Sequence, residues 1–193
     1  MNICIISNSV PKINIDINNI FTYKKKGDKN MSTMKNLQEA FAGESQANRK
    51  YLAFAKKADE EGYTQIAKLF RAAADAETVH AHKHLQVMGG IKNTEENLKG
   101  AIAGETEEFE SMYPEFIKEA KNEGNDAAVV TFENANAVEK IHADLYAKAL
   151  ENMANDEDVV YYVCQVCGNT VENEAPEKCP ICGVPKTLFK KIE

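Results

Sequence analysis

The sequence predicts a mainly α-helical chain, with a four-helix bundle followed by a small metal-bound β/loop domain. Two Glu-x-x-His motifs, Glu77 to His80 and Glu139 to His142, lie on amphipathic stretches, and two Cys-x-x-Cys pairs fall near the C-terminus. The first 33 residues have little periodicity of either kind. We therefore expect a disordered extension over 1–33, a bundle over 34–154, a linker over 155–160 and a small domain over 161–193.

Composition excludes several classes of function. The net charge is -7 and there is no long basic run, so we do not expect nucleic acid as a partner. No run of ~18 apolar residues is present, so we expect no membrane span. Four of the five cysteines form Cys-x-x-Cys pairs, a spacing that favours a metal over disulfides and indicates a reducing compartment. We expect a cytoplasmic protein.

The N-terminal extension, rich in Ile, Asn and Lys, resembles neither a secretory signal nor a transit peptide. Met31 and Met34 stand just before the first convincing helix. Our hypothesis is that the extension is a disordered tail read from an upstream start codon. Cys4 belongs to this tail, and we expect a free thiol with no role.

Apolar residues recurring every three or four positions predict four helices of about twenty-five to thirty residues. Glycines at 62, 89–90 and 124 separate them. Pro114 should kink the third helix or mark a local rearrangement of its backbone. The expected helices span 36–61, 64–88, about 93 to 123, and 126–152.

Acidic residues and histidines fall on the apolar faces of all four helices. A Glu and a His three residues apart project from the same helix face. One such carboxylate alone is usually a boundary residue that reaches water, and one such His is usually a hydrogen-bonded core residue. The coincidence of five carboxylates and two imidazoles favours a metal centre, because unpaired buried charges would cost several kcal/mol each. The candidate ligands are Glu44, Glu77, His80, Glu105, Glu108, Glu139 and His142.

This donor set is the one that ferritin-like bundles use to hold two metal ions. Carboxylates with one His per metal suit iron well, and manganese is also compatible. His82 and His84 are more readily interpreted as surface residues or as neighbours of the ligands. Tyr51 and Tyr113 are either core aromatics or hydrogen-bond partners of a ligating carboxylate.

The C-terminal cysteines predict a four-thiolate metal site. The pairs Cys164/Cys167 and Cys179/Cys182 are each followed by Gly, which permits the turn that directs backbone N–H groups at sulfur. About thirty residues need such a metal to fold. Zinc would be structural and iron redox-active, and the spacing alone does not choose between them.

With these motifs in place, the chain resembles the rubrerythrin family over residues 34–193. The resemblance is carried by the stretches 40–47 and 103–114, by both Glu-x-x-His motifs and by the Cys-Pro-x-Cys-Gly knuckle. It implies a non-haem di-iron site with the seven ligands named above, in which Glu108 is the extra carboxylate of the family and exchanges with His80. It also implies nearby roles for Tyr51 and Tyr113, and a rubredoxin-type iron on the four cysteines.

The family resemblance implies reduction of hydrogen peroxide to water, with electrons from NADH reaching the chain through a separate reductase or rubredoxin. No Gly-rich nucleotide-binding fingerprint is present, so a partner must supply those electrons. The alternatives are a ferroxidase or iron-binding protein that uses oxygen, and a non-enzymatic module with zinc in its tail.

Two features depart from the family pattern or constrain the assembly. Asn169 stands where many rubredoxins have an aromatic residue, which is expected to alter packing around the iron. The link 89–93 is short: it reaches about 20 Å when extended, whereas return along the bundle needs roughly 30 Å. We therefore expect a homodimer with exchanged helix pairs, in which each di-iron centre combines ligands of two subunits.

Overall fold

The structure, a computed structural model, describes residues 32–155 and 158–193. Contacts divide the described residues into two compact units, with the boundary between His84 and Leu85. Most of the expected N-terminal extension, including Cys4, lies outside the described residues. No helix in the described ranges combines the length and the hydropathy that a membrane span requires.

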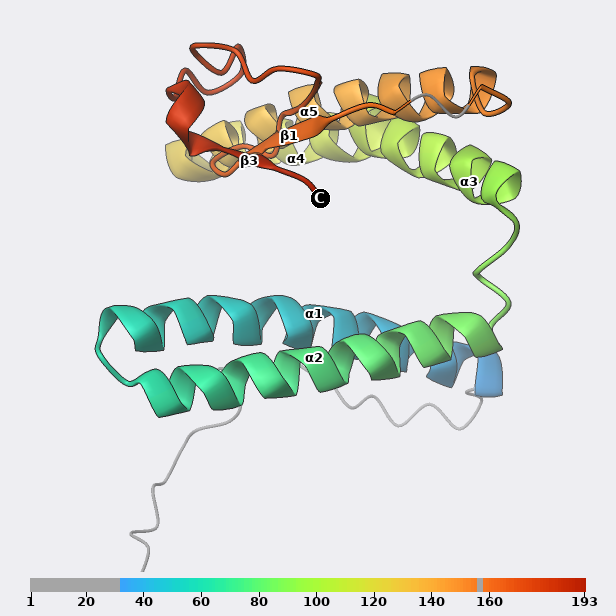
Figure 1. Cartoon of the computed structure of the whole chain (residues 1–193), viewed down its shortest axis with the longest axis vertical. Coiled ribbons are helices and arrows are strands. Elements are labelled where there is room, and N and C mark those ends of the chain that lie inside the picture. The colour runs from blue at the N-terminus through green and yellow to red at the C-terminus, as the bar shows by residue number, and fades with distance from the viewer. Residues whose placement is uncertain (1–31, 156–157) are drawn as a thin grey trace, which may run out of the picture. The chain divides into compact units, whose positions relative to one another are not determined.

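The first unit is a hairpin of two long helices, α1 (Thr33–Glu60) and α2 (Thr64–Val87) (Figure 1). Ser32 begins α1 by accepting a hydrogen bond from the backbone N–H of Lys35. Gly62, with φ +84°, makes the turn between the helices. Small side chains let the helices approach closely, and the buried ones on α2 recur every seven residues, at Ala67, Ala74 and Ala81.

A buried amide joins the two helices at the level of the candidate ligands. Asn48 is 7% exposed and donates through Nδ2 to the carbonyl of Ala74 at 2.7 Å and to Thr78 Oγ1 at 2.8 Å. Asn48 lies one turn after Glu44, and Thr78 directly follows Glu77. These hydrogen bonds therefore fix the register that brings the two glutamates together.

The second unit begins with helices α3 (Thr94–Glu107), α4 (Tyr113–Glu123) and α5 (Asp126–Glu151). Both α3 and α4 pack on α5. Asn93 caps α3 and Asn125 caps α5, each accepting from a backbone N–H three residues later. Gly124 has φ +69° and ends α4. The four expected helices are thus confirmed, with the third divided into α3 and α4.

A π-helical turn, η2 (Glu108–Met112), separates α3 from α4. The N–H of Tyr113 bonds to the carbonyl of Glu108, five residues earlier, which is the pattern of a π-turn. Pro114 lies in the first turn of α4, where its missing N–H costs least. The backbone rearrangement expected near Pro114 is therefore confirmed, and it takes the form of one inserted residue.

The C-terminal segment forms a three-stranded antiparallel sheet in the order β2-β1-β3. Its elements are β1 (Tyr161–Cys164), β2 (Thr170–Glu172), the 3-10 turn η3 (Lys186–Leu188) and β3 (Phe189–Lys191). In the register, Val163 lies opposite Thr170 on one side and Lys190 on the other. The small β/loop domain predicted from the cysteines is confirmed.

This small domain contacts α5 within the second unit. Val138 of α5 is 2% exposed, and a Cβ placed on Gly168 would meet its Cγ1 at 3.8 Å. Lys148 pairs with Glu172 further along the helix. The first cysteine knuckle is therefore seated on the same helix that carries Glu139 and His142.

Candidate metal centre

The α1–α2 cluster consists of Glu44, Glu77 and His80. One ligand atom from each lies within 4.8 Å of the other two. His80 Nδ1 is 2.9 Å from Glu77 Oε2, because the two residues are one turn apart on α2. His80 is 56% exposed at its side chain, whereas Glu77 is 19% exposed.

Burial and the proximity of two carboxylates act together on the electrostatics of this cluster. Burial raises the pKa of Glu44, and a hydrogen bond and the negative charge from Glu77 raise it further. The charges of His80 and His84 act in the opposite direction. His84 thus lies near enough to influence Glu44, while His82 is exposed. Such a carboxyl pair needs a shared proton or a cation between its members.

The α3–α5 cluster consists of Glu105, Glu139 and His142, again with ligand atoms within 4.8 Å of one another. His142 Nδ1 is 2.8 Å from Glu139 Oε2 and 3.9 Å from Glu105 Oε1. Burial raises the pKa of Glu105, and the charge of Glu139 adds to this shift. The second cluster therefore repeats the chemistry of the first.

Glu108 lies beside the α3–α5 cluster without being one of its three close members. Burial raises the pKa of Glu108, the charge of Glu105 raises it further, and His142 lowers it. Tyr113 is also close to this cluster. Burial raises the pKa of its hydroxyl, and the charges of three glutamates raise it further; these are Glu139, Glu108 and Glu105. A neutral phenol among carboxylates is placed to donate a hydrogen bond.

The two clusters are copies of one pattern that differ by a single residue. Glu44 and Tyr51 are seven residues apart, whereas Glu105 and Tyr113 are eight apart. The extra position falls in the stretch that contains η2, and Glu108 begins that turn. The π-turn therefore absorbs an insertion and places an additional carboxylate beside the second cluster only.

An aromatic trio accompanies each cluster. Tyr51 belongs to the trio on α1 and α2, and Tyr113 to that on α4 and α5. Ring centroids within each trio are 5.6 to 6.4 Å apart. The trios are Tyr51, Phe54 and Phe70, and Tyr113, Phe116 and Phe132. Both tyrosines thus pack against two phenylalanines of their own unit.

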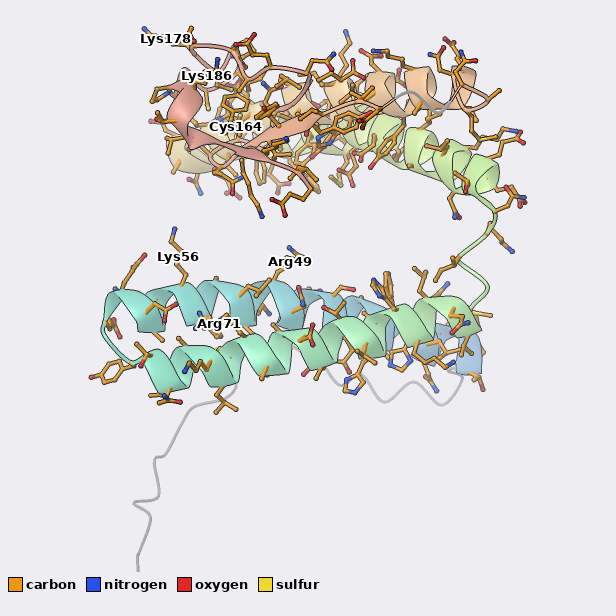
Figure 2. All side chains as sticks on the ribbon, viewed as in Figure 1. Arg49, Lys56, Arg71, Cys164, Lys178 and Lys186 are labelled. Carbon is orange, nitrogen blue, oxygen red and sulfur yellow. The ribbon has the colours of Figure 1, made fainter. Side chains whose placement is uncertain are left out.

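The thiolate cluster consists of Cys164, Cys167, Cys179 and Cys182, all present as free thiols with ligand atoms within 4.8 Å. Sulfur–sulfur distances are 3.7 Å for Cys164 to Cys182 and 3.5 Å for Cys167 to Cys179. Figure 2 shows Cys164 at the small domain, where β1 ends.

Burial raises the pKa of the Cys167 thiol. Burial also acts to raise that of Cys179, but hydrogen bonds from the backbone N–H groups of Cys182 and Ile181 dominate and lower its pKa to about 7. Backbone donors aimed at sulfur are what a thiolate site needs.

Asn169 adds further donors to the thiolate cluster. Its backbone N–H bonds to Cys167, and its Nδ2 lies 3.7 Å from Cys179 Sγ. The side chain is fully buried, and its Oδ1 has no partner among the described residues. Asn169 therefore places, where many rubredoxins have an aromatic residue, a side-chain amide that contacts one ligand, Cys179.

These donor sets fit the expected metals. Buried carboxylate pairs with an adjacent imidazole suit iron, and four free thiols within ligand distance of one another suit a tetrathiolate iron. The sequence predicted all of these positions. It did not identify Thr170, which contacts His142 from a distant segment, or Asn48, although Asn48 lies one turn from Glu44 on the same face.

Comparison with known proteins agrees with this geometry. The family model described as Rubrerythrin matches residues 35–150, and that of the rubrerythrin rubredoxin-like domain matches residues 162–190. Nigerythrin of Nitratidesulfovibrio vulgaris is 39% identical over 172 residues, covering 82% of this chain and 85% of the relative. Rubrerythrin-2 of Clostridium acetobutylicum is 36% identical over 179 residues, covering 84% and 97%.

A solved structure is similar as well. The fully reduced, all-ferrous state of nigerythrin matches with a TM-score of 0.52 and 36% identity, covering 88% of this chain and 91% of that one. Sequence, structure and all three ligand clusters agree, and the chain belongs to the rubrerythrin family, with a C-terminal rubredoxin-like domain.

Proposed function

We propose that the chain is a cytoplasmic non-haem di-iron peroxidase that reduces hydrogen peroxide to water. The observation that carries this proposal is the pairing of two Glu-Glu-His clusters with a thiolate cluster seated on α5. Iron storage has no use for such an electron-transfer site, whereas reduction of peroxide requires repeated delivery of single electrons.

The proposed roles follow from the donor chemistry. Two irons would be held by Glu44, Glu77, His80, Glu105, Glu108, Glu139 and His142, and a third iron by the four cysteines. When bound, the irons supply the two electrons that, with two protons, convert one hydrogen peroxide to two waters. The carboxylates compensate the changing charge, and Tyr51 and Tyr113 act as hydrogen-bond donors beside them.

The two histidines differ in how firmly they are held. His142 is 26% exposed and bonded through both ring nitrogens, whereas His80 is 56% exposed and bonded through Nδ1 alone among the described residues. We assign His80 to the position where a ligand exchanges with Glu108. Electrons come from a separate NADH-linked reductase or rubredoxin.

Peroxide should reoxidise the reduced protein faster than oxygen does. We expect fast return of the red thiolate-to-iron band when the anaerobic reduced protein is mixed with hydrogen peroxide in a stopped-flow instrument. Replacement of Glu139 by Ala should slow this return by at least roughly 100-fold, because a ligand is lost. The control is Glu133→Ala on the same helix; among the described residues, Glu133 pairs with Lys121 alone, at the surface.

Faster return with oxygen than with peroxide would instead indicate a ferroxidase. A colourless protein after reconstitution with iron would indicate a structural zinc site in the small domain, and the peroxidase proposal would then be wrong. Equal rates in the Glu139 and Glu133 variants would show that the α3–α5 cluster takes no part in the reaction.

We further propose that the active form is a homodimer in which helix pairs are exchanged. Only residues 88–93 connect α2 to α3, and their extended length is about 20 Å. Parallel placement of α2 and α3 with their ligands level requires roughly 30 Å. Each di-iron centre would then take one α1–α2 cluster and the α3–α5 cluster of the partner subunit.

Complementation tests this exchange. A heterodimer of Glu77→Ala and Glu139→Ala chains, purified through two different tags, would hold one doubly altered centre and one intact centre. We expect about half of the wild-type peroxide rate, since one of two centres is restored, while each variant alone is inactive. No recovery in the heterodimer, or a fully active monomer in sedimentation, would contradict helix exchange.

Asn169 should raise the reduction potential of the tetrathiolate iron. Its Nδ2 donor stabilises sulfur most in the reduced state, which carries more negative charge. Replacement by the similarly shaped Leu should lower the midpoint potential by roughly 40 mV, the equivalent of one hydrogen bond of about 1 kcal/mol. Spectroelectrochemistry measures this value.

The matched control for Asn169 is Gln165→Met. Gln165 lies in the same knuckle, but its amide bonds to the carbonyl of Val163 instead of a sulfur. An unchanged potential in the Asn169 variant, or an equal shift in the control, would rule out the side-chain donor.

A further inference from the structure

His142 is bonded through both nitrogens of its ring, and its two partners belong to different parts of the second unit. Nδ1 faces the carboxylates of Glu139 and Glu105, at 2.8 and 3.9 Å. Nε2 lies 2.9 Å from the hydroxyl oxygen of Thr170, at the start of β2. One imidazole therefore contacts both the α3–α5 cluster and the rubredoxin-like domain.

The bonding of Thr170 fixes which ring nitrogen carries the hydrogen. Its hydroxyl donates to the carbonyl of Gly168 at 3.1 Å. A hydroxyl has one hydrogen, so the same oxygen must accept from His142 rather than donate to it. Nε2 then carries the N–H, and the lone pair of Nδ1 is directed to the carboxylates, where a metal ion is expected.

Thr170 also stands at the end of a short bonded route from the thiolate cluster. It follows Cys167 by three residues, through Gly168 and Asn169. Gly168 has φ +83°, turns the chain and lies close to Val138, which is one helical turn before His142 on α5. The knuckle is thus seated on α5 in a way that directs the Thr170 hydroxyl at the imidazole.

We propose that Thr170 is a positioning residue that selects Nδ1 of His142 for the metal and connects the thiolate cluster to the α3–α5 cluster of its own chain. This inference rests on the proposed electron-transfer function. With iron bound at both sites, one electron would move and no atom would be transferred: the tetrathiolate site would be oxidised by one electron and the bundle site reduced by one. Hydrogen peroxide would be the terminal oxidant.

The first test is independent of activity. In zinc-loaded, diamagnetic protein, ¹⁵N–¹H NMR should show the N–H of His142 on Nε2, with slow exchange against solvent. Thr170→Val keeps the β-branched shape and removes the hydroxyl, so exchange of this proton should become at least roughly tenfold faster. Thr170→Ser restores the hydroxyl and should restore slow exchange.

The second test follows electron transfer in the iron-loaded protein. Thr170→Val should slow the return of the red band after mixing with peroxide by about tenfold or more, with an unchanged midpoint potential of the tetrathiolate iron. Thr170→Ser should recover the rate. The control is Thr131→Val, the same change at an exposed position of α5, where the hydroxyl bonds only to its own helix.

The results separate this inference from the proposed function. An N–H on Nδ1 of His142, or equal exchange and equal rates in the Val and wild-type proteins, would overturn the role of Thr170. If the wild-type protein does not react with peroxide, the proposed function fails, and the NMR result still decides whether Thr170 positions His142. An intact red band in the Val variant shows that its knuckle has folded.

Discussion

Repulsion between neighbouring carboxylates is the constraint on which the bundle depends. Glu44 with Glu77, and Glu105 with Glu139, bring like charges together in partly buried surroundings. Burial raises the pKa of Glu44 and of Glu105, and the neighbouring carboxylate raises it further. Two such pairs are tolerable when cations lie between their oxygens. The alanine-lined contact between α1 and α2 and the hydrogen bonds of Asn48 hold the first pair in place. The fold therefore fixes the positions of the negative charges that a bound metal ion would neutralise.

One additional residue in the second helix pair explains the asymmetry of the site. Both helix pairs carry the same Glu-Glu-His cluster with an aromatic trio, but only the second contains the π-turn Glu108–Met112. An additional residue in a helix shifts everything after it by about 100°, and the π-turn confines that shift to a few residues. Glu108 is the carboxylate that the insertion presents, and it has no counterpart on α1.

Much of this arrangement was predictable from sequence because it is local. The Glu-x-x-His spacing places two ligands one turn apart on a single helix, and Cys-x-x-Cys followed by Gly specifies a knuckle whatever surrounds it. Pro114 indicated a disturbance of the helix but not its kind. A proline within a helical pattern is compatible with a kink or with a local rearrangement such as a π-turn, because both accommodate the absence of its backbone N–H. Thr170 was out of reach: its bond to His142 spans 28 residues and depends on how the small domain docks on α5.

Three ordinary interactions join the rubredoxin-like domain to α5. Gly168 lies close to Val138, Thr170 is hydrogen-bonded to His142, and Glu172 forms an ion pair with Lys148. Together they place the thiolate cluster beside the α3–α5 cluster. We expect each chain to hold two irons with oxygen and nitrogen ligands and one iron with sulfur ligands. Mössbauer spectroscopy of ⁵⁷Fe-reconstituted protein measures this ratio directly. The expected spectrum has about two-thirds of its area in non-sulfur sites and one-third in a tetrathiolate site. Iron found only in the tetrathiolate component would contradict the assignment of two irons to the glutamate and histidine clusters.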